Sequence, residues 1–81
     1  MQVTIRFFAS HREATGRESS VVELPEGATA ADAFARACTD HPALARAAGA
    51  VAFAVNLEHV SPKTPLHDGD EVAFLPPVAG G

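Results

Sequence analysis

The sequence predicts an α+β domain in which a mixed sheet of four to five strands carries one main helix on one face. Three observations support this class. Apolar and polar residues alternate along several short segments, which is the pattern of half-buried strands. One central segment has apolar residues at helical spacing. The segments follow in the order strand, strand, helix, strand, short strand, strand, which places one crossing helix against one sheet.

The first two strands lie near the N-terminus. Val3, Ile5 and Phe7 alternate with other residues and form the core face of the first strand. Residues 11–18 are polar and contain a glycine, which predicts a loop. Residues 19–24 form the second strand, the hairpin partner of the first, and the Pro-Glu-Gly sequence that follows is expected to end it in a turn.

The main helix is expected to begin at Thr29, whose hydroxyl caps it, with Asp32 placed to complete a capping box. It ends near His41, because the next residue is a proline and disfavours the α conformation before it. A short helical turn over residues 43–48 follows, with Gly49 as its stop. The residues on the core side of the main helix are Ala30, Ala33, Phe34, Ala37 and Cys38.

The remaining strands occupy the C-terminal part of the chain. Residues 51–57 form the third strand, and a tight turn at residues 57–59 returns the chain through a short strand at residues 60–61. Residues 62–69 form a loop, and an Asp-Gly-Asp turn leads into the last strand at residues 71–75. The apolar face of the third strand consists of Val51, Phe53, Val55 and Leu57.

Residues 76–81 differ abruptly from the strand before them. Pro76 and Pro77 fix φ and remove backbone donors, so this segment cannot continue a central strand. The final Gly-Gly sequence has no side chains, which gives it high conformational freedom and leaves the carboxylate of Gly81 sterically bare. We therefore predict a domain over residues 1–75 and an extended, flexible tail whose carboxylate is the functional group. The alternative is an ordinary frayed end.

Composition narrows the possible functions. The formal net charge is −4 and the six basic residues are scattered, which argues against nucleic-acid binding and suits a partner with a basic surface. Cys38 is the single cysteine, so no internal disulfide can form, and no hydrophobic run is long enough to span a membrane. We therefore expect a cytoplasmic protein. The four histidines have no metal-ligand spacing, so no metal site is expected.

No group of side chains predicts a catalytic centre. Cys38 lies on the apolar face of the main helix, where a thiol acts as a small hydrophobe rather than a nucleophile. Phe8 and Leu75 either belong to the core or, if exposed, mark a docking surface around the exit of the tail. The other residues of that apolar patch are Pro76, Pro77 and Val78.

Several short motifs follow one another along the whole chain in the order of a known family. They are Phe7-Phe8-Ala9, Arg12-Glu13 with Gly16, Ala54-Val55-Asn56, Pro65-Leu66, residues 68–74, Pro76-Pro77-Val78 and Gly80-Gly81. With these motifs the chain resembles the ThiS/MoaD family of ubiquitin-like sulfur carriers, and in particular the small subunits of molybdopterin synthase. The specific part is the run DGDEVAF followed by PPV and a final GG. Leu75 and Ala79 depart from the family, in which Phe and Ser or Thr are frequent at these positions.

The resemblance implies a ubiquitin-like β-grasp fold with the last strand at the centre of the sheet. It also implies a non-catalytic carrier that binds no cofactor itself. A ubiquitin-activating-like adenylyltransferase would use ATP to adenylate Gly81, and the adenylate would then become a thiocarboxylate. The sulfur would pass to cyclic pyranopterin monophosphate in the large synthase subunit, which supplies the catalytic residues.

The implied assembly is a heterotetramer with two copies of each subunit. We expect its carrier subunit to contact both enzymes through the tail and the residues around its exit. These partner-binding residues are Phe8, Leu75, Pro76, Pro77, Val78, Ala79 and Gly80.

Two other functions remain open at this point. A sulfur carrier for thiamin-thiazole or cysteine synthesis would use the same chemistry, although the Pro-Pro-Val run and the length argue against the thiazole version. A ubiquitin-like protein-conjugating tag, joined through Gly81 to lysines of its targets, would share the activation step.

Overall fold

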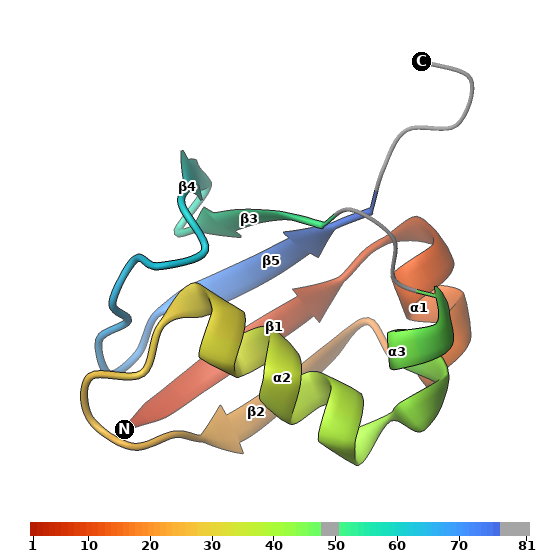
Figure 1. Cartoon of the computed structure of the whole chain (residues 1–81), viewed down its shortest axis with the longest axis horizontal. Coiled ribbons are helices and arrows are strands. Elements are labelled where there is room, and N and C mark those ends of the chain that lie inside the picture. The colour runs from red at the N-terminus through yellow and green to blue at the C-terminus, as the bar shows by residue number, and fades with distance from the viewer. Residues whose placement is uncertain (48–50, 77–81) are drawn as a thin grey trace.

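The computed structural model of the chain describes residues 1–47 and 51–76. Within these ranges it has one five-stranded sheet, and α2 crosses one face of that sheet (Figure 1). The elements are β1 (Gln2–Phe7), α1 (Ala9–Thr15), β2 (Ser19–Glu23), α2 (Ala30–Asp40), α3 (Pro42–Ala47), β3 (Ala52–Val55), β4 (Glu58–Val60) and β5 (Glu71–Leu75).

The last strand is the central strand of the sheet, as predicted. The strand order is β2-β1-β5-β3-β4. β5 runs parallel to β1 and antiparallel to β3, so Phe74 has Phe7 on one side and Phe53 on the other. β1 also pairs with β2 in the antiparallel arrangement that the sequence predicts. The chain therefore reaches its C-terminal segment from the most enclosed position in the sheet.

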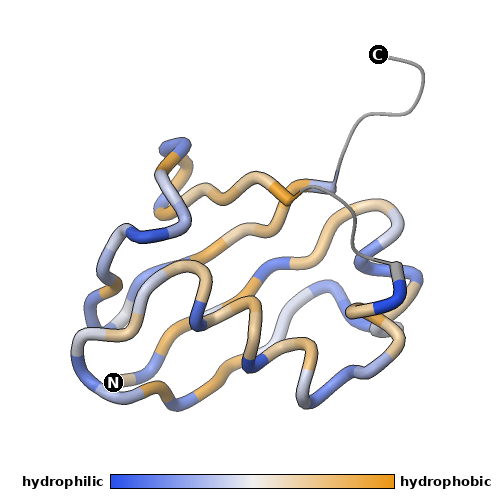
Figure 2. Tube along the Cα trace, in the orientation of Figure 1, coloured by the Kyte–Doolittle hydropathy of each residue, from blue (hydrophilic) through white to orange (hydrophobic). Residues whose placement is uncertain are grey.

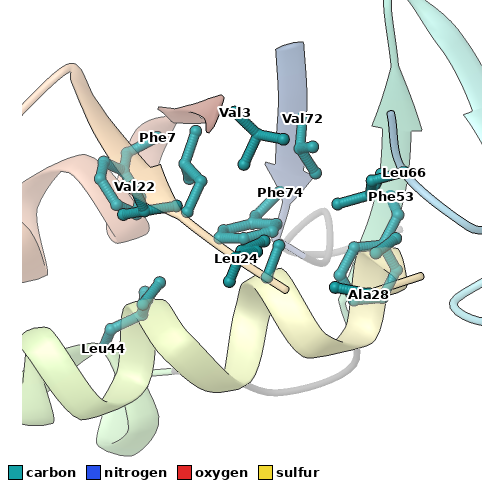
Figure 3. Packing of buried hydrophobic residues seen from close by; sticks show 14 residues of the cluster. Val3, Phe7, Val22, Leu24, Ala28, Leu44, Phe53, Leu66, Val72 and Phe74 are labelled. Carbon is teal, nitrogen blue, oxygen red and sulfur yellow. The ribbon is translucent and has the colours of Figure 1, made fainter. Parts of the chain in front are cut away.

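The core lies between the sheet and α2. Phe74 is fully buried, and Figure 3 shows it pointing from β5 toward the helix, between Phe7 and Phe53. Hydrophobic residues are concentrated along the strands, whereas the connecting loops are largely hydrophilic (Figure 2). The predicted core face of β1 is confirmed, because Val3, Ile5 and Phe7 are all buried.

The main helix forms as predicted. The Thr29 hydroxyl accepts a 3.2 Å hydrogen bond from the Asp32 backbone, and the Asp32 carboxylate accepts one of 2.9 Å from the Thr29 backbone. This reciprocal pair is the predicted capping box. On the core face Ala30, Ala33 and Ala37 are buried, while Phe34 and Cys38 are partly buried against the core. The small alanines let α2 approach the sheet closely.

The prediction of a loop over residues 11–18 is wrong, because most of this segment belongs to α1. Ala9 has φ 46°, which turns the chain directly from β1 into the helix, and Gly16 ends the helix with φ 70°. The buried residue of α1 is His11. A short helix whose buried side chain is a histidine shows no apolar period, which is the reason why the sequence pattern indicated a loop.

The turn after the third strand is also displaced from its predicted position. It lies at Asn56 and Leu57, which have φ values of 49° and 73°, and the short strand that follows is Glu58–Val60 rather than residues 60–61. Positive φ at both central residues is the geometry of a two-residue hairpin turn that matches strand twist. Leu57 is consequently 93% exposed instead of lying on the core face.

Two further predictions concern the region after the main helix. The helical turn predicted over residues 43–48 is observed as α3, Pro42–Ala47, and residue 48 lies outside the described residues. Gly49, the predicted stop of that turn, lies outside the described residues.

Candidate functional site

The candidate site is the end of β5, where the chain leaves the sheet. Phe7 pairs with Phe74 in the parallel register, so the residues that follow them, Phe8 and Leu75, lie at the same end of the sheet. Leu75 also pairs with Ala52 on β3. Phe7 and Phe74 point into the core, and alternation along a strand directs their successors toward the opposite face. Two neighbouring elements and the central strand thus converge at this exit.

Phe8 is exposed rather than part of the core, with 39% of its surface accessible. It precedes α1 as an extended residue, and its carbonyl accepts the His11 backbone N–H at 2.9 Å. The guanidinium of Arg6 lies 5.9 Å from the centre of the Phe8 ring, in the range of a cation–π contact. Arg6 also lies 3.9 Å from the carboxylate of Glu71, the first residue of β5.

Leu75 and Pro76 are both partly buried. They continue β5 beyond the fully buried Phe74, so the base of the predicted tail starts from a fixed position. The remaining predicted site residues lie outside the described part of the chain. They are Pro77, Val78, Ala79, Gly80 and Gly81.

The opposite end of β5 is fastened by side-chain hydrogen bonds. Asn56 donates to the Asp70 carboxylate at 3.0 Å and accepts the Glu71 backbone N–H at 3.0 Å. Asp68 accepts the Gln2 backbone N–H at 2.7 Å. The Asp-Gly-Asp sequence and Asn56 therefore act as structural residues that fix the start of the central strand. Sequence reasoning had assigned the two aspartates to a turn, but had not linked them to Asn56.

Two titratable groups of the described interior have pKa values displaced by burial. Burial lowers the pKa of His11, an effect that the nearby Phe74 backbone opposes only in part. Burial also raises the pKa of the Cys38 thiol, so less thiolate is available. Among the described residues, no group of three or more possible ligands could hold a metal ion.

His11 is a feature that sequence reasoning missed. It is fully buried, and neither ring nitrogen makes a hydrogen bond of good geometry within the described structure. Its ring lies 6.2 Å from that of Phe34. The one sequence feature that could have indicated its burial is its position three residues after the strand-end residue Phe8, in a segment of mostly polar residues.

None of the described helices is long and apolar enough to cross a membrane.

A sequence model of the ThiS family matches residues 5–81. The chain belongs to the ThiS family. A curated relative from Chlamydomonas reinhardtii, named molybdopterin synthase sulfur carrier subunit, is 42% identical over 83 residues, covering 100% of both chains. The family resemblance predicted from the motifs is thereby confirmed over the full length of this ThiS-family chain.

Solved structures show the same fold. The small archaeal modifier SAMP1 from Haloferax volcanii superposes with a TM-score of 0.87 at 29% identity, covering 100% of both chains. A chain in a protein–protein complex of subunits 1 and 2 of the molybdopterin-converting factor from Helicobacter pylori gives a TM-score of 0.69 at 29% identity, again covering 100% of both chains. This ThiS-family chain therefore has the predicted ubiquitin-like β-grasp fold.

Proposed function

We propose that this chain is the sulfur carrier subunit of a molybdopterin synthase. The observation that carries the proposal is the full-length similarity to curated carrier subunits, at 42% identity to the Chlamydomonas protein. The position of β5 supports the proposal, because residues 76–81 directly follow this central strand and so start from a fixed point in the sheet. A folded domain that ends in Gly-Gly can present its terminal carboxylate to other proteins.

The chemistry assigned to Gly81 follows from its carboxylate. A carboxylate is a poor electrophile, and adenylation with ATP supplies a leaving group. Displacement of AMP by a sulfur donor gives a thiocarboxylate, an anionic sulfur nucleophile comparable to a thiolate. The carrier needs no general base, because the enzymes that receive it provide one. Cyclic pyranopterin monophosphate is the proposed sulfur acceptor, as the resemblance to small subunits of molybdopterin synthase implies.

The proposed partners are the large synthase subunit and a ubiquitin-activating-like adenylyltransferase, which uses the ATP. Residues 76–81, when fully extended, reach at most about 20 Å, which is enough to enter a buried site while the domain stays outside. The exposed ring of Phe8 and the side chain of Leu75 lie where a partner would surround the tail. We propose a heterotetramer with two copies of each subunit, located in the cytoplasm.

The test is the intact mass of the chain after incubation with ATP, the adenylyltransferase and a sulfur donor. A chain lacking Gly81 is the matched control. We expect the full-length chain to gain the mass difference between sulfur and oxygen, whereas the chain lacking Gly81 should not gain it. The thiocarboxylated chain should then convert cyclic pyranopterin monophosphate to molybdopterin when mixed with the large subunit. An unchanged mass in the presence of an active adenylyltransferase would refute the proposal.

A second candidate function is protein conjugation. The close structural likeness to a small archaeal modifier, with a TM-score of 0.87, favours it. The two functions share adenylation and differ in the acceptor. Isopeptide bonds between Gly81 and lysines of many proteins would indicate a modifier, whereas thiocarboxylate consumed by the large subunit indicates the carrier. Sulfur transfer to a thiazole or cysteine synthase instead would indicate the related carriers.

A further inference from the structure

The two edges of the sheet differ in how well they are protected against pairing with another strand. β2 and β4 are the edge strands, and they lie at opposite margins of the sheet (Figure 1). β4 has only three residues, and Ser61-Pro62 follows it directly. Short length and a nearby proline both hinder pairing at an edge. β2 contains neither a lysine nor a proline, and its five residues pair with β1 in a register without a bulge.

The hydrogen bonds between β1 and β2 show which backbone groups of β2 face outward. Leu24 and Met1 exchange two bonds, of 2.8 Å and 2.7 Å. Bonded and non-bonded pairs alternate along an antiparallel ladder, so every second residue back from Leu24 directs its peptide groups toward β1. The β2 residues between them direct theirs outward, and these are Ser19, Val21 and Glu23. The Glu23 carbonyl confirms this direction, since it accepts a 2.9 Å bond from the Arg36 guanidinium of α2.

Val21 lies exposed at the middle of this edge. Its side chain is on the open face of the sheet, because the next residue, Val22, is buried on the face that α2 covers. The one charged side chain of β2 is that of Glu23, whose carboxylate lies 3.6 Å from the Met1 ammonium. The edge therefore combines outward backbone donors and acceptors with an apolar, uncharged centre.

We propose that two copies of this chain associate edge to edge, with β2 of one copy antiparallel to β2 of the other. The pairing is self-complementary about a two-fold axis at Val21. The two Val21 residues exchange both of their backbone bonds, and Ser19 of each copy does the same with Glu23 of the other. The Glu23 carbonyl can accept a bond from Ser19 as well as from Arg36, because it has two lone pairs. The product is one continuous sheet with five strands from each copy.

The side chains of β2 favour this register. The two valines lie directly opposite each other and cover each other's apolar surface, while Glu23 lies opposite Ser19 and meets no like charge. A slip of the axis by one residue would place Val21 opposite either Ser19 or the Glu23 carboxylate of the other copy. The contact goes beyond the proposed function, because β1 separates this edge from β5 and no activation of Gly81 is needed.

The first experiment follows the sedimentation of the full-length chain from about 10 µM to about 1 mM, the range in which a contact this small is expected to form. The average mass should rise from one chain toward two. Val21→Lys places two ammonium groups opposite each other and should weaken association by roughly tenfold or more. His59→Lys puts the same charge on the β4 edge and is the matched control, which should associate like the wild type.

Urea denaturation checks that both lysine variants remain folded. An average mass that stays at one chain over the whole range overturns the inference. So does an equal weakening of association in folded Val21→Lys and His59→Lys chains, because the contact would then not involve β2.

Cysteine substitutions test the register in a Cys38→Ala background. Val21→Cys places two thiols at directly opposed positions, where Cα atoms of a bonded pair lie about 5.5 Å apart, within the range of a disulfide. Ser19→Cys is the control, because residue 19 lies opposite Glu23 and its own counterpart is about 13 Å away along the strand. Oxidation with glutathione disulfide should join the Val21→Cys chains and leave the Ser19→Cys chains single. Equal cross-linking of the two variants would overturn the inferred pairing.

Discussion

The ring of Phe74 meets the ring of Phe34 edge to face, with 5.0 Å between their centroids. Phe74 also contacts Phe53 at 5.8 Å and Phe7 at 6.1 Å, so one residue of the central strand joins three elements of the core. Aromatic pairs in this geometry stabilise the fold beyond their buried area. A residue just before the exit of the chain therefore also links β1, β3 and α2 in the core.

Replacement of Phe74 tests this arrangement. We expect Phe74→Ala to lower the free energy of unfolding by about 3–5 kcal/mol, because it removes a fully buried ring and leaves a cavity. Urea denaturation followed by circular dichroism measures the effect. Val21→Ala, at a residue that is 60% exposed on β2, is the control and should change stability far less. Equal losses in the two variants would contradict the central role of Phe74.

Phe8 should affect binding rather than folding. Its ring is exposed and lies 5.9 Å from the Arg6 guanidinium, so Phe8→Ala should leave most of the stability intact. An aromatic residue at the centre of an interface typically contributes roughly 1–2 kcal/mol or more, which predicts an affinity for the large subunit that is about five- to thirty-fold weaker. Calorimetric titration measures this affinity. Wild-type affinity in a folded Phe8→Ala chain would remove Phe8 from the docking surface.

The two prolines at the base of the tail should lower the entropy lost when a partner binds it. Replacing Pro76 and Pro77 with glycine enlarges the set of conformations of the free tail. We expect a penalty of about 1–2 kcal/mol in binding to the large subunit for the double variant. The domain should unfold at nearly the same denaturant concentration. An unchanged dissociation constant would show that stiffness at the base of the tail has no role.

Replacement of the turn residue Leu57 by glycine should raise the stability of the protein, whereas most substitutions lower it. It has φ 73° and is 93% exposed, so its side chain strains the backbone and packs little. Leu57→Gly should therefore stabilise the protein by about 0.5–1 kcal/mol. Asn56 also has positive φ, but its side chain bonds Asp70 and the Glu71 backbone. Asn56→Gly is the matched control, and it should destabilise the protein in the same thermal unfolding experiment.

Local sequence patterns correctly predicted the elements whose local conformational preference agrees with their tertiary contacts. Alternation located β1 and β5, and Thr29 with Asp32 located the start of α2. The errors lie where long-range contacts decide. β3 ends before Asn56, which has positive φ and bonds to Asp70, 14 residues away, and a pattern of alternating residues contains no information on that contact.

For the candidate site, the sequence predicted the strand from which residues 76–81 follow, and the roles of the site residues stay predictions. The residues around the exit follow from the family motifs and from the central position of the last strand. The exposure of Phe8 did not follow, because it depends on the sharp turn at Ala9 that leads into α1. The burial of His11 could not be predicted from the sequence, because it comes from contacts with other elements, such as the ring of Phe34, and not from a local pattern.

The buried His11 predicts a dependence of stability on pH. Burial lowers its pKa in the folded state below the ordinary value of 6.5, whereas the unfolded chain keeps the ordinary value. As the pH falls through 6.5, the unfolded state takes up a proton that the folded state does not, so this group lowers the stability of the fold. Above that pH His11 is neutral in both states and makes no such contribution. The loss is complete once the pH is below the folded-state pKa.

His11→Leu should remove this part of the pH dependence, because leucine does not titrate and has a similar size. It should also be more stable by about 1–2 kcal/mol near neutral pH, since a buried polar ring that makes no hydrogen bond of good geometry within the described residues is replaced by an apolar side chain. Urea denaturation between pH 5 and pH 8, a range chosen about the ordinary pKa of histidine, measures both effects. His59→Gln, which replaces an exposed histidine, is measured alongside as the control substitution. Parallel profiles for wild type and His11→Leu would show that His11 does not link folding to pH.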